Sequence, residues 1–134
     1  MWKRLLRVLC HIFLISFALN FVWEQVHSLL YVHYKGGPIT QFVLLHATFA
    51  DAIFITITGF VFLYFKELRK KLWISFILLV LLAIGIETWA LETGRWAYKD
   101  IMPLIPIIKI GLTPTIQLGL LGYTTLSFTK IDTI

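Results

Sequence analysis

Long apolar runs alternate along the chain with short segments that carry most of the charged, glycine and proline residues. A helix needs roughly 20 consecutive apolar residues to cross the hydrocarbon core of a bilayer. Four segments approach or exceed that length, at about 5–32, 41–65, 72–93 and 106–128. The pattern predicts an all-α fold, an integral membrane four-helix bundle that forms one transmembrane domain over residues 1–134.

Turn-forming residues mark the ends of the first three segments. Gly36-Gly37-Pro38 separates the first segment from the second, and Thr40 is a candidate helix cap. The basic stretch Lys66–Lys71 predicts a tight loop, and Gly94 predicts the end of the third helix. Glycines within the segments are expected to permit close helix contact, at Gly59, Gly85, Gly119 and Gly122.

The last segment is interrupted by prolines at positions 103, 106 and 114. Thr113-Pro114 is a good helix start, and a helix from there to Phe128 would be only about 22 Å long. Two structures fit this pattern. One is a proline-kinked helix over about 106–128, and the other is a coil or half-helix over about 101–112 that is partly re-entrant.

The composition agrees with a membrane location. The 134 residues are 59% hydrophobic and only 14% charged, and a soluble domain would carry nearly twice that charged fraction. Basic residues at the chain ends and in the second loop favour cytoplasmic termini in a bacterial inner membrane by the positive-inside rule. Eight lie on that side (Lys3, Arg4, Arg7, Lys66, Arg69, Lys70, Lys71 and Lys130) and four on the other (Lys35, Arg95, Lys99 and Lys109).

Most ionisable residues inside the apolar segments fall at one membrane depth. They belong to three segments, and threading the chain through a bilayer brings them into its outer half: Glu24, His27, His46, Asp51, Glu87 and Glu92. A carboxylate in hydrocarbon costs on the order of 3 kcal/mol on insertion scales, so a functional reason for this layer is expected.

Helical spacing groups these residues into faces. Asn20, Glu24 and His27 share one face of the first segment, and Glu92 and Arg95 can pair three residues apart in the third. Gln117 adds a polar side chain from the last segment. The aromatic residues near the outer ends are expected in an interfacial belt, at Trp89, Trp96 and Tyr98.

Glu24, Asp51 and Glu87 have no basic neighbour in sequence. Desolvation favours the protonated form of a carboxylic acid, which can then act as a proton donor. The predicted catalytic residues are therefore these three acids with His27. The predicted substrate-binding residues are Asn20, Trp23, His46, Glu92, Arg95 and Gln117. Together with Asp51, His46, Glu87 and Glu92, the Glu24-x-x-His27 spacing offers the ligand types of a di-metal bundle, which leaves a metal site as a further alternative. Such a bundle normally uses two of these motifs and this chain has one, so no metal ligand is assigned, and no cofactor is expected.

Asn20-Phe21-Val22-Trp23-Glu24 has the form Asn-x-x-Trp-Glu. This stretch resembles a motif of the integral-membrane terpene cyclases that close meroterpenoid rings, a likeness that implies a proton donor at Glu24. The stretch from Glu87 to Trp96, with Tyr98 and Met102-Pro103, more faintly resembles membrane proteins of carotenoid biosynthesis. The chain also looks like uncharacterised small bacterial membrane proteins, a likeness that implies no function. The enzyme families have roughly seven or eight helices, which a homodimer of this chain would match.

The sequence thus favours a membrane-embedded enzyme that transfers protons on an isoprenoid or another lipid, of cyclase, hydratase or isomerase type. The alternatives are a small proton- or cation-coupled transporter and a structural or assembly subunit. The expected partner is a membrane lipid or isoprenoid substrate. Nucleic-acid binding is not expected, because there is no glycine-rich phosphate loop and no basic stripe outside the loops.

Overall fold

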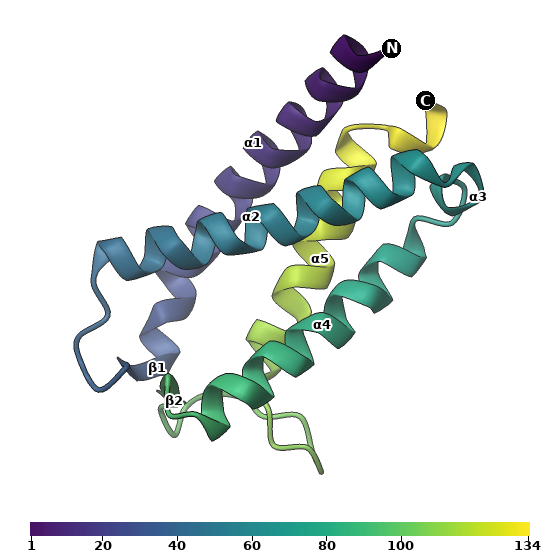
Figure 1. Ribbon diagram of the computed structural model, residues 1–134. Coiled ribbons are helices and arrows are strands. Elements are labelled where there is room, and N and C mark those ends of the chain that lie inside the picture. The colour runs from purple at the N-terminus through teal and green to yellow at the C-terminus, as the bar shows by residue number, and fades with distance from the viewer.

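The computed structural model describes residues 1–134 as a mostly helical chain with one small sheet (Figure 1). The helices and strands are α1 (Trp2–His27), β1 (Tyr31–Tyr34), α2 (Gln41–Tyr64), α3 (Lys66–Arg69), α4 (Trp73–Glu92), β2 (Trp96–Tyr98) and α5 (Leu112–Phe128). Short 3₁₀ turns follow α1 and α5, at Ser28–Leu30 and Ile131–Thr133. Three helical segments are long and apolar enough to cross a membrane, at Trp2–Leu30, Gln41–Tyr64 and Trp73–Glu92.

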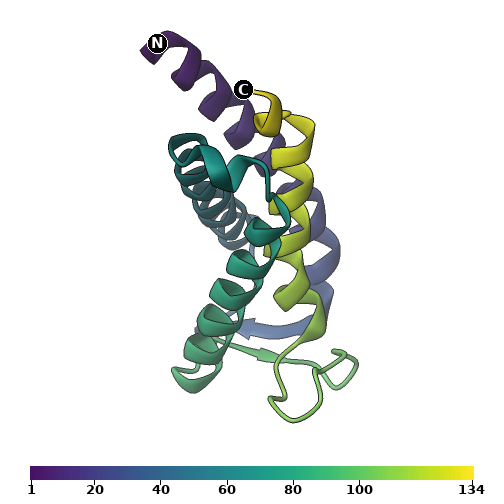
Figure 2. The same ribbon diagram turned by 90° about the vertical axis from the view of Figure 1, so that its right-hand side faces the viewer.

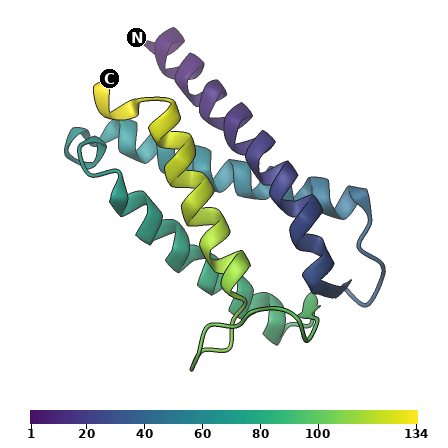
Figure 3. The same cartoon turned by 180° about the vertical axis from the view of Figure 1, so that it is seen from behind.

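The four long helices form two layers. Figure 1 shows α2 and α4 in front, and Figure 3 shows α1 and α5 on the opposite face. The layers are joined by contacts of α1 with α2 and of α4 with α5, and α5 also packs against α1. Helices α2 and α4 meet at α3 and diverge toward the sheet, while both chain termini lie at the α3 end (Figures 1 and 2). The wide end between α2 and α4 is where the polar residues gather.

The hydrophobic core fills the half of the molecule nearer the termini. Its largest fully buried members come from every long helix: Ile12, Ile55, Phe62, Leu79 and Leu126. Ile131 of the last turn is also fully buried against this cluster. Many large apolar side chains on the outer faces remain exposed, as expected for helices whose surroundings are themselves apolar.

Helices α4 and α5 approach closely at glycines of α5. A Cβ added at Gly119 would lie 2.9 Å from the backbone oxygen of Phe76 and 2.7 Å from Val80 Cγ2. A Cβ at Gly122 would overlap Leu79 Cδ1. The expectation of a close contact is wrong for Gly85, because a Cβ there would meet nothing within 4 Å.

The prediction of helix throughout the segment 5–32 is wrong at its end. Helix α1 stops at His27, and Tyr31–Tyr34 pairs antiparallel with Trp96–Tyr98 across more than 60 residues of chain. Tyr31 lies opposite Tyr98, and Tyr34 lies opposite Trp96. Aromatic residues are enriched in strands, because they pack well across a pleated surface. The fold is therefore predominantly helical rather than all-α.

The last segment is not a kinked helix from position 106. Residues 99–111 contain no helix, and α5 begins at Leu112 with Gly111 at its N-cap, so Thr113 is not the cap. Prolines at 103 and 106 and positive φ angles at Ile107 (75°) and Lys109 (53°) keep this loop non-helical. The loop Lys66–Lys71 likewise contains the single helical turn α3.

A methyl group at position 119 should separate α4 from α5. We expect Gly119→Ala to lower the free energy of unfolding by about 1–3 kcal/mol, because the backbone of Phe76 cannot move without shifting α4. Gly85→Ala adds the same methyl group to open space and should leave stability unchanged or slightly raise it. Unfolding of the purified protein in detergent measures both; equal stabilities would contradict the close approach.

Candidate functional site

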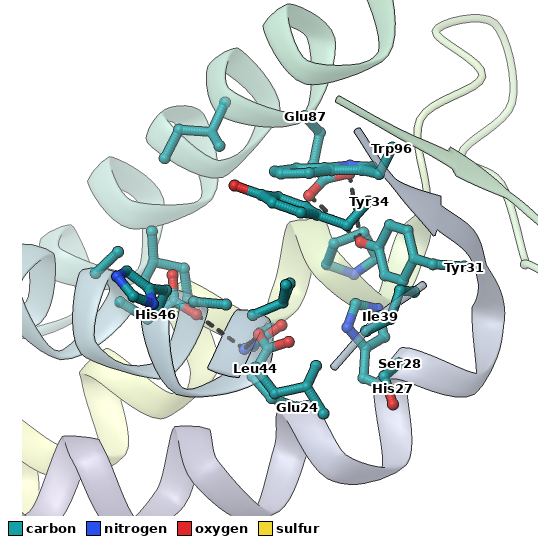
Figure 4. A pocket seen from close by; sticks show the side chains of 18 of the residues that line it. Glu24, His27, Ser28, Tyr31, Tyr34, Ile39, Leu44, His46, Glu87 and Trp96 are labelled. Atoms are coloured by element: carbon teal, nitrogen blue, oxygen red, sulfur yellow. Dashed lines mark hydrogen bonds between the residues drawn. The ribbon is translucent and has the colours of Figure 1, made fainter. Parts of the chain in front are cut away.

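A cavity of about 350 Å³ lies at the wide end of the bundle (Figure 4). It is lined by 21 residues, 12 of them hydrophobic, from the four long helices, both strands, and the connections that hold Ser28 and Ile39. This size lies within the range of small-molecule sites, about 300–1,000 Å³. Its polar lining includes Glu24, His27, His46, Asp51, Glu87 and Gln117, and no lysine or arginine.

The side-chain amide of Gln117 joins three helices at the base of the cavity. Its Nε2 lies 2.7 Å from Oε1 of Glu24 and 3.1 Å from Oδ2 of Asp51. The same nitrogen lies 3.1 Å from Oδ1 of Asn20. Gln117 is buried on α5, while Glu24 and Asp51 are half-buried on α1 and α2. The two carboxyl groups therefore converge on one nitrogen from separate helices.

The orientation of Asn20 is fixed by α1 itself. Its Nδ2 donates to the backbone oxygen of Ser16 at 2.8 Å, so its side-chain oxygen faces Gln117. Asn20 is fully buried and lies behind the cavity rather than on its wall. Asn20 and Glu24 meet the same amide because residues four apart lie above one another on a helix.

Glu87 of α4 is surrounded by hydrogen-bond donors from the sheet. Oε2 of Glu87 accepts from the hydroxyl of Tyr98 at 2.5 Å and from Nε1 of Trp96 at 3.1 Å. The Tyr31 hydroxyl lies 3.4 and 3.5 Å from the two carboxyl oxygens. Glu87 is 6% exposed. Its carboxyl group is thus held by three neutral donors, and Figure 4 shows Trp96 and Tyr31 beside it.

The pairing of β1 with β2 brings the aromatic donors to Glu87. Because Tyr31 lies opposite Tyr98, the sheet carries both phenol groups to the same point above α4. Burial, followed by the nearby Glu87 carboxylate, raises the pKa of Tyr31 far above its ordinary value. Burial and the hydrogen bond to Glu87 also raise the pKa of Tyr98. Both phenols therefore remain hydrogen-bond donors throughout the physiological pH range.

His27 contributes an unpartnered nitrogen to the cavity wall. Its Nε2 lies 2.9 Å from Oγ1 of Thr113, and that hydroxyl donates to the sulfur of Met102 at 3.3 Å. Because the hydroxyl proton is used for Met102, Thr113 accepts from Nε2–H, and the neutral ring then has a free lone pair on Nδ1. Nδ1 is buried and has no partner, and the residue is 5% exposed.

Other predicted site residues lie elsewhere. Trp23 packs against the hydrophobic core and does not line the cavity. His46 is exposed at the edge of the cavity, where its Nδ1 contacts the backbone oxygen of Phe42. Glu92 is exposed, and Arg95 lies over the ring of Trp89, 4.4 Å from its centroid.

The predicted Glu92–Arg95 pair is not formed, because α4 ends at Glu92 and the chain then turns at Gly94. Gly94 has a φ of 70°, a left-handed conformation that glycine adopts without strain. Spacing along a continuous helix therefore does not apply to these two residues.

Sequence reasoning missed the roles of three aromatic residues. The apolar pattern predicts helix at Tyr31 and an interfacial belt at Trp96 and Tyr98, whereas all three side chains donate to Glu87. The available signal was the spacing of aromatic residues at every second or third position in Tyr31–Tyr34 and Trp96–Tyr98.

Comparison with protein-family models, curated proteins and solved structures gives no match. No group of three or more His, Cys, Asp or Glu side chains is placed to hold a metal ion. The groups that the site itself offers are two carboxyl groups that share a donor, a third held by aromatic donors, and an imidazole nitrogen without a partner.

Loss of the Gln117 amide should be costly. We expect Gln117→Leu to lower the free energy of unfolding by about 1–3 kcal/mol, because it leaves buried acceptors without their donor. Gln41→Leu removes an amide of the exposed Gln25–Gln41 pair and should change stability by less than about 0.5 kcal/mol. Denaturant unfolding compares the two. Similar small effects would show that Gln117 does not hold the carboxyl groups.

Proposed function

We propose that the protein is an integral membrane enzyme that transfers protons on an isoprenoid or another lipid. The observation that carries this proposal is the convergence of Glu24, Asp51 and Glu87, from three helices, on one largely apolar cavity without a lysine or arginine. Carboxyl groups placed in apolar surroundings are costly, and proteins use them for proton chemistry.

In the proposed orientation, α1, α2 and α4 span the membrane and α5 completes a four-helix bundle. At 17 residues, α5 extends about 25 Å, short of the hydrocarbon thickness of about 30 Å. In this orientation the loop 99–111 and the sheet occupy the part of the hydrocarbon thickness that α5 does not span. Both termini and α3 lie at one end, where the eight basic residues gather, which supports a cytoplasmic position for that end (Figure 1).

Cysteine labelling tests this orientation. In a Cys10→Ser background, Lys109→Cys should react with a membrane-impermeant maleimide in spheroplasts, because the loop 99–111 lies on the outer side. Lys70→Cys should react only after permeabilisation, because it lies beside α3 at the cytoplasmic end. The reverse labelling pattern would contradict the orientation and place the cavity in the inner half of the bilayer.

Hydrogen-bond counting supports a proton held between Glu24 and Asp51. An amide group has two protons, yet three side-chain oxygens lie within hydrogen-bond distance of Gln117 Nε2. A proton carried by one of the two carboxyl groups supplies the third donor that these oxygens need. In this proposal the pair is the proton donor, and Glu24 is the acid, as the likeness to the terpene cyclases also implies.

The proposed reaction moves one proton onto a carbon–carbon double bond. The π electrons form a C–H bond with the proton from the Glu24–Asp51 pair, which leaves a carboxylate and a carbocation. Glu87 and the aromatic rings beside it stabilise that cation electrostatically. Loss of a proton from a neighbouring carbon, to the carboxylate or to Nδ1 of His27, then forms a new double bond.

Access to the cavity is proposed from the lipid side. Small side chains of α2 and α4 line the space where these helices diverge, at Ala47, Ala50 and Ala83. In this proposal a lipid enters between the two helices and does not cross the polar ends of the bundle. The core cluster around Ile12, Ile55 and Leu79 closes the other half of the bundle, and this favours an enzyme over a transporter.

Deuterium transfer tests the enzymatic function. We expect the purified protein, incubated in D₂O with an isoprenoid-rich lipid extract of the source cells, to place deuterium on carbon in one lipid. Glu24→Gln should slow this transfer by about 10²–10⁴-fold, since it removes the general acid while keeping the shape of the side chain. Mass spectrometry of the extracted lipids measures the transfer.

The control variant is Glu92→Gln, which removes an exposed carboxyl group outside the cavity and should keep full activity. Equal transfer by wild type and Glu24→Gln, or none by wild type, would contradict the proposal.

A further inference from the structure

Around Glu24, Asp51 and His27 the cavity presents acceptors without a free donor, although the unpartnered hydroxyl of Tyr34 also lines it. The protons of Gln117 Nε2, Tyr98 and Trp96 are already directed at Asn20 and at carboxyl oxygens. Three carboxyl groups and Nδ1 of His27 remain as acceptors around the same space. A polar head group that complements this part of the wall must therefore bring N–H or O–H donors.

His27 provides the independent sign of a missing donor. Its Nδ1 is buried and unpartnered, although the other ring nitrogen is held by Thr113. Buried polar groups are nearly always hydrogen-bonded, so an isolated acceptor on a cavity wall marks a place for a ligand atom. Figure 4 shows the His27 ring between Tyr31 and Glu24, facing the same space as the carboxyl groups.

The charge and the aromatic lining favour a cation over a neutral donor. The cavity has carboxyl groups from three helices and no basic lysine or arginine side chain. The rings of Tyr31, Tyr34 and Trp96 form its upper wall in Figure 4. Aromatic faces attract ammonium groups, most strongly where water is excluded.

The rest of the lining fits an alkyl chain. Apolar residues of α2 and α4 extend from the carboxyl groups toward the side where these helices diverge, at Val43, Leu44, Ala47 and Ile86. A ligand whose head is at Glu24 and Asp51 would place its tail along these side chains. An elongated amphiphile matches both ends of the cavity.

We propose that the cavity binds a protonated primary amine attached to a long alkyl chain. The ammonium group donates to the Glu24–Asp51 pair and to Nδ1 of His27, and the chain lies between α2 and α4. This inference rests on the proposed function only in using the same cavity, because binding requires no turnover. A bound ammonium group would also occupy the position of the cation in the proposed reaction.

The test measures binding of radiolabelled dodecylamine to the full chain in phosphatidylcholine nanodiscs, after subtraction of empty nanodiscs. Unlabelled dodecylamine should compete at least about tenfold better than dodecanol, which has the same chain and no charge. Dodecyltrimethylammonium, which has charge but no N–H donor, should fall between them. Equal competition by dodecanol would overturn the proposal, and this comparison needs no variant.

Variants locate the head group. Asp51→Asn should weaken dodecylamine binding by about tenfold or more, and His27→Leu should weaken dodecylamine while leaving dodecyltrimethylammonium unchanged. Glu92→Gln is the matched carboxyl control and should bind as wild type does. Unchanged amine binding in both cavity variants would also overturn the proposal. Amine binding without deuterium transfer would overturn the enzymatic function alone, and deuterium transfer without amine binding would overturn this inference alone.

Discussion

The amide of Gln117 is the contact on which the rest of the site depends. It reaches Asn20 and Glu24 of the neighbouring α1 and Asp51 of α2, which belongs to the other layer. Without it, two carboxyl groups would face each other across an apolar cavity with no basic residue to compensate them. The position of Gln117 depends in turn on the close packing of α5 against α4, which the glycines at 119 and 122 allow. A backbone constraint two residues away thus sets the geometry of the polar cluster.

The second half of the cavity is organised by a different element. Glu87 is held by the sheet rather than by another long helix, because the paired strands bring Tyr31, Trp96 and Tyr98 over the end of α4. These donors are neutral and satisfied, whereas the Glu24–Asp51 pair has fewer donors than acceptors. Two kinds of carboxyl group therefore face one space. In the proposed mechanism this difference separates the proton donor from the group that stabilises positive charge.

Part of this arrangement could be predicted from the sequence. Helical spacing placed Asn20, Glu24 and His27 on one face, and the depth of the polar layer brought Asp51, Glu87 and Gln117 to the same level. The helical period is a local property, so these predictions did not depend on the tertiary structure. The two-stranded sheet does depend on the tertiary structure, because its strands are short and more than 60 residues apart in the sequence. It could therefore not be predicted from a local pattern. The helix predicted through Tyr31 was wrong because strand pairing replaced helix formation after His27. The prediction of a Glu92–Arg95 pair was wrong because α4 ends at Glu92 and the chain turns at Gly94.

A double-mutant cycle on Asp51→Asn and Gln117→Leu tests most directly whether the carboxyl groups converge on one donor. The free energy of unfolding is measured for the wild type, both single variants and the double variant in the same detergent. Residues that contact each other show an interaction energy of about 0.5–3 kcal/mol, and we expect a value in this range. Additivity within about 0.3–0.5 kcal/mol would mean that the two side chains do not interact, and it would contradict the account of the site.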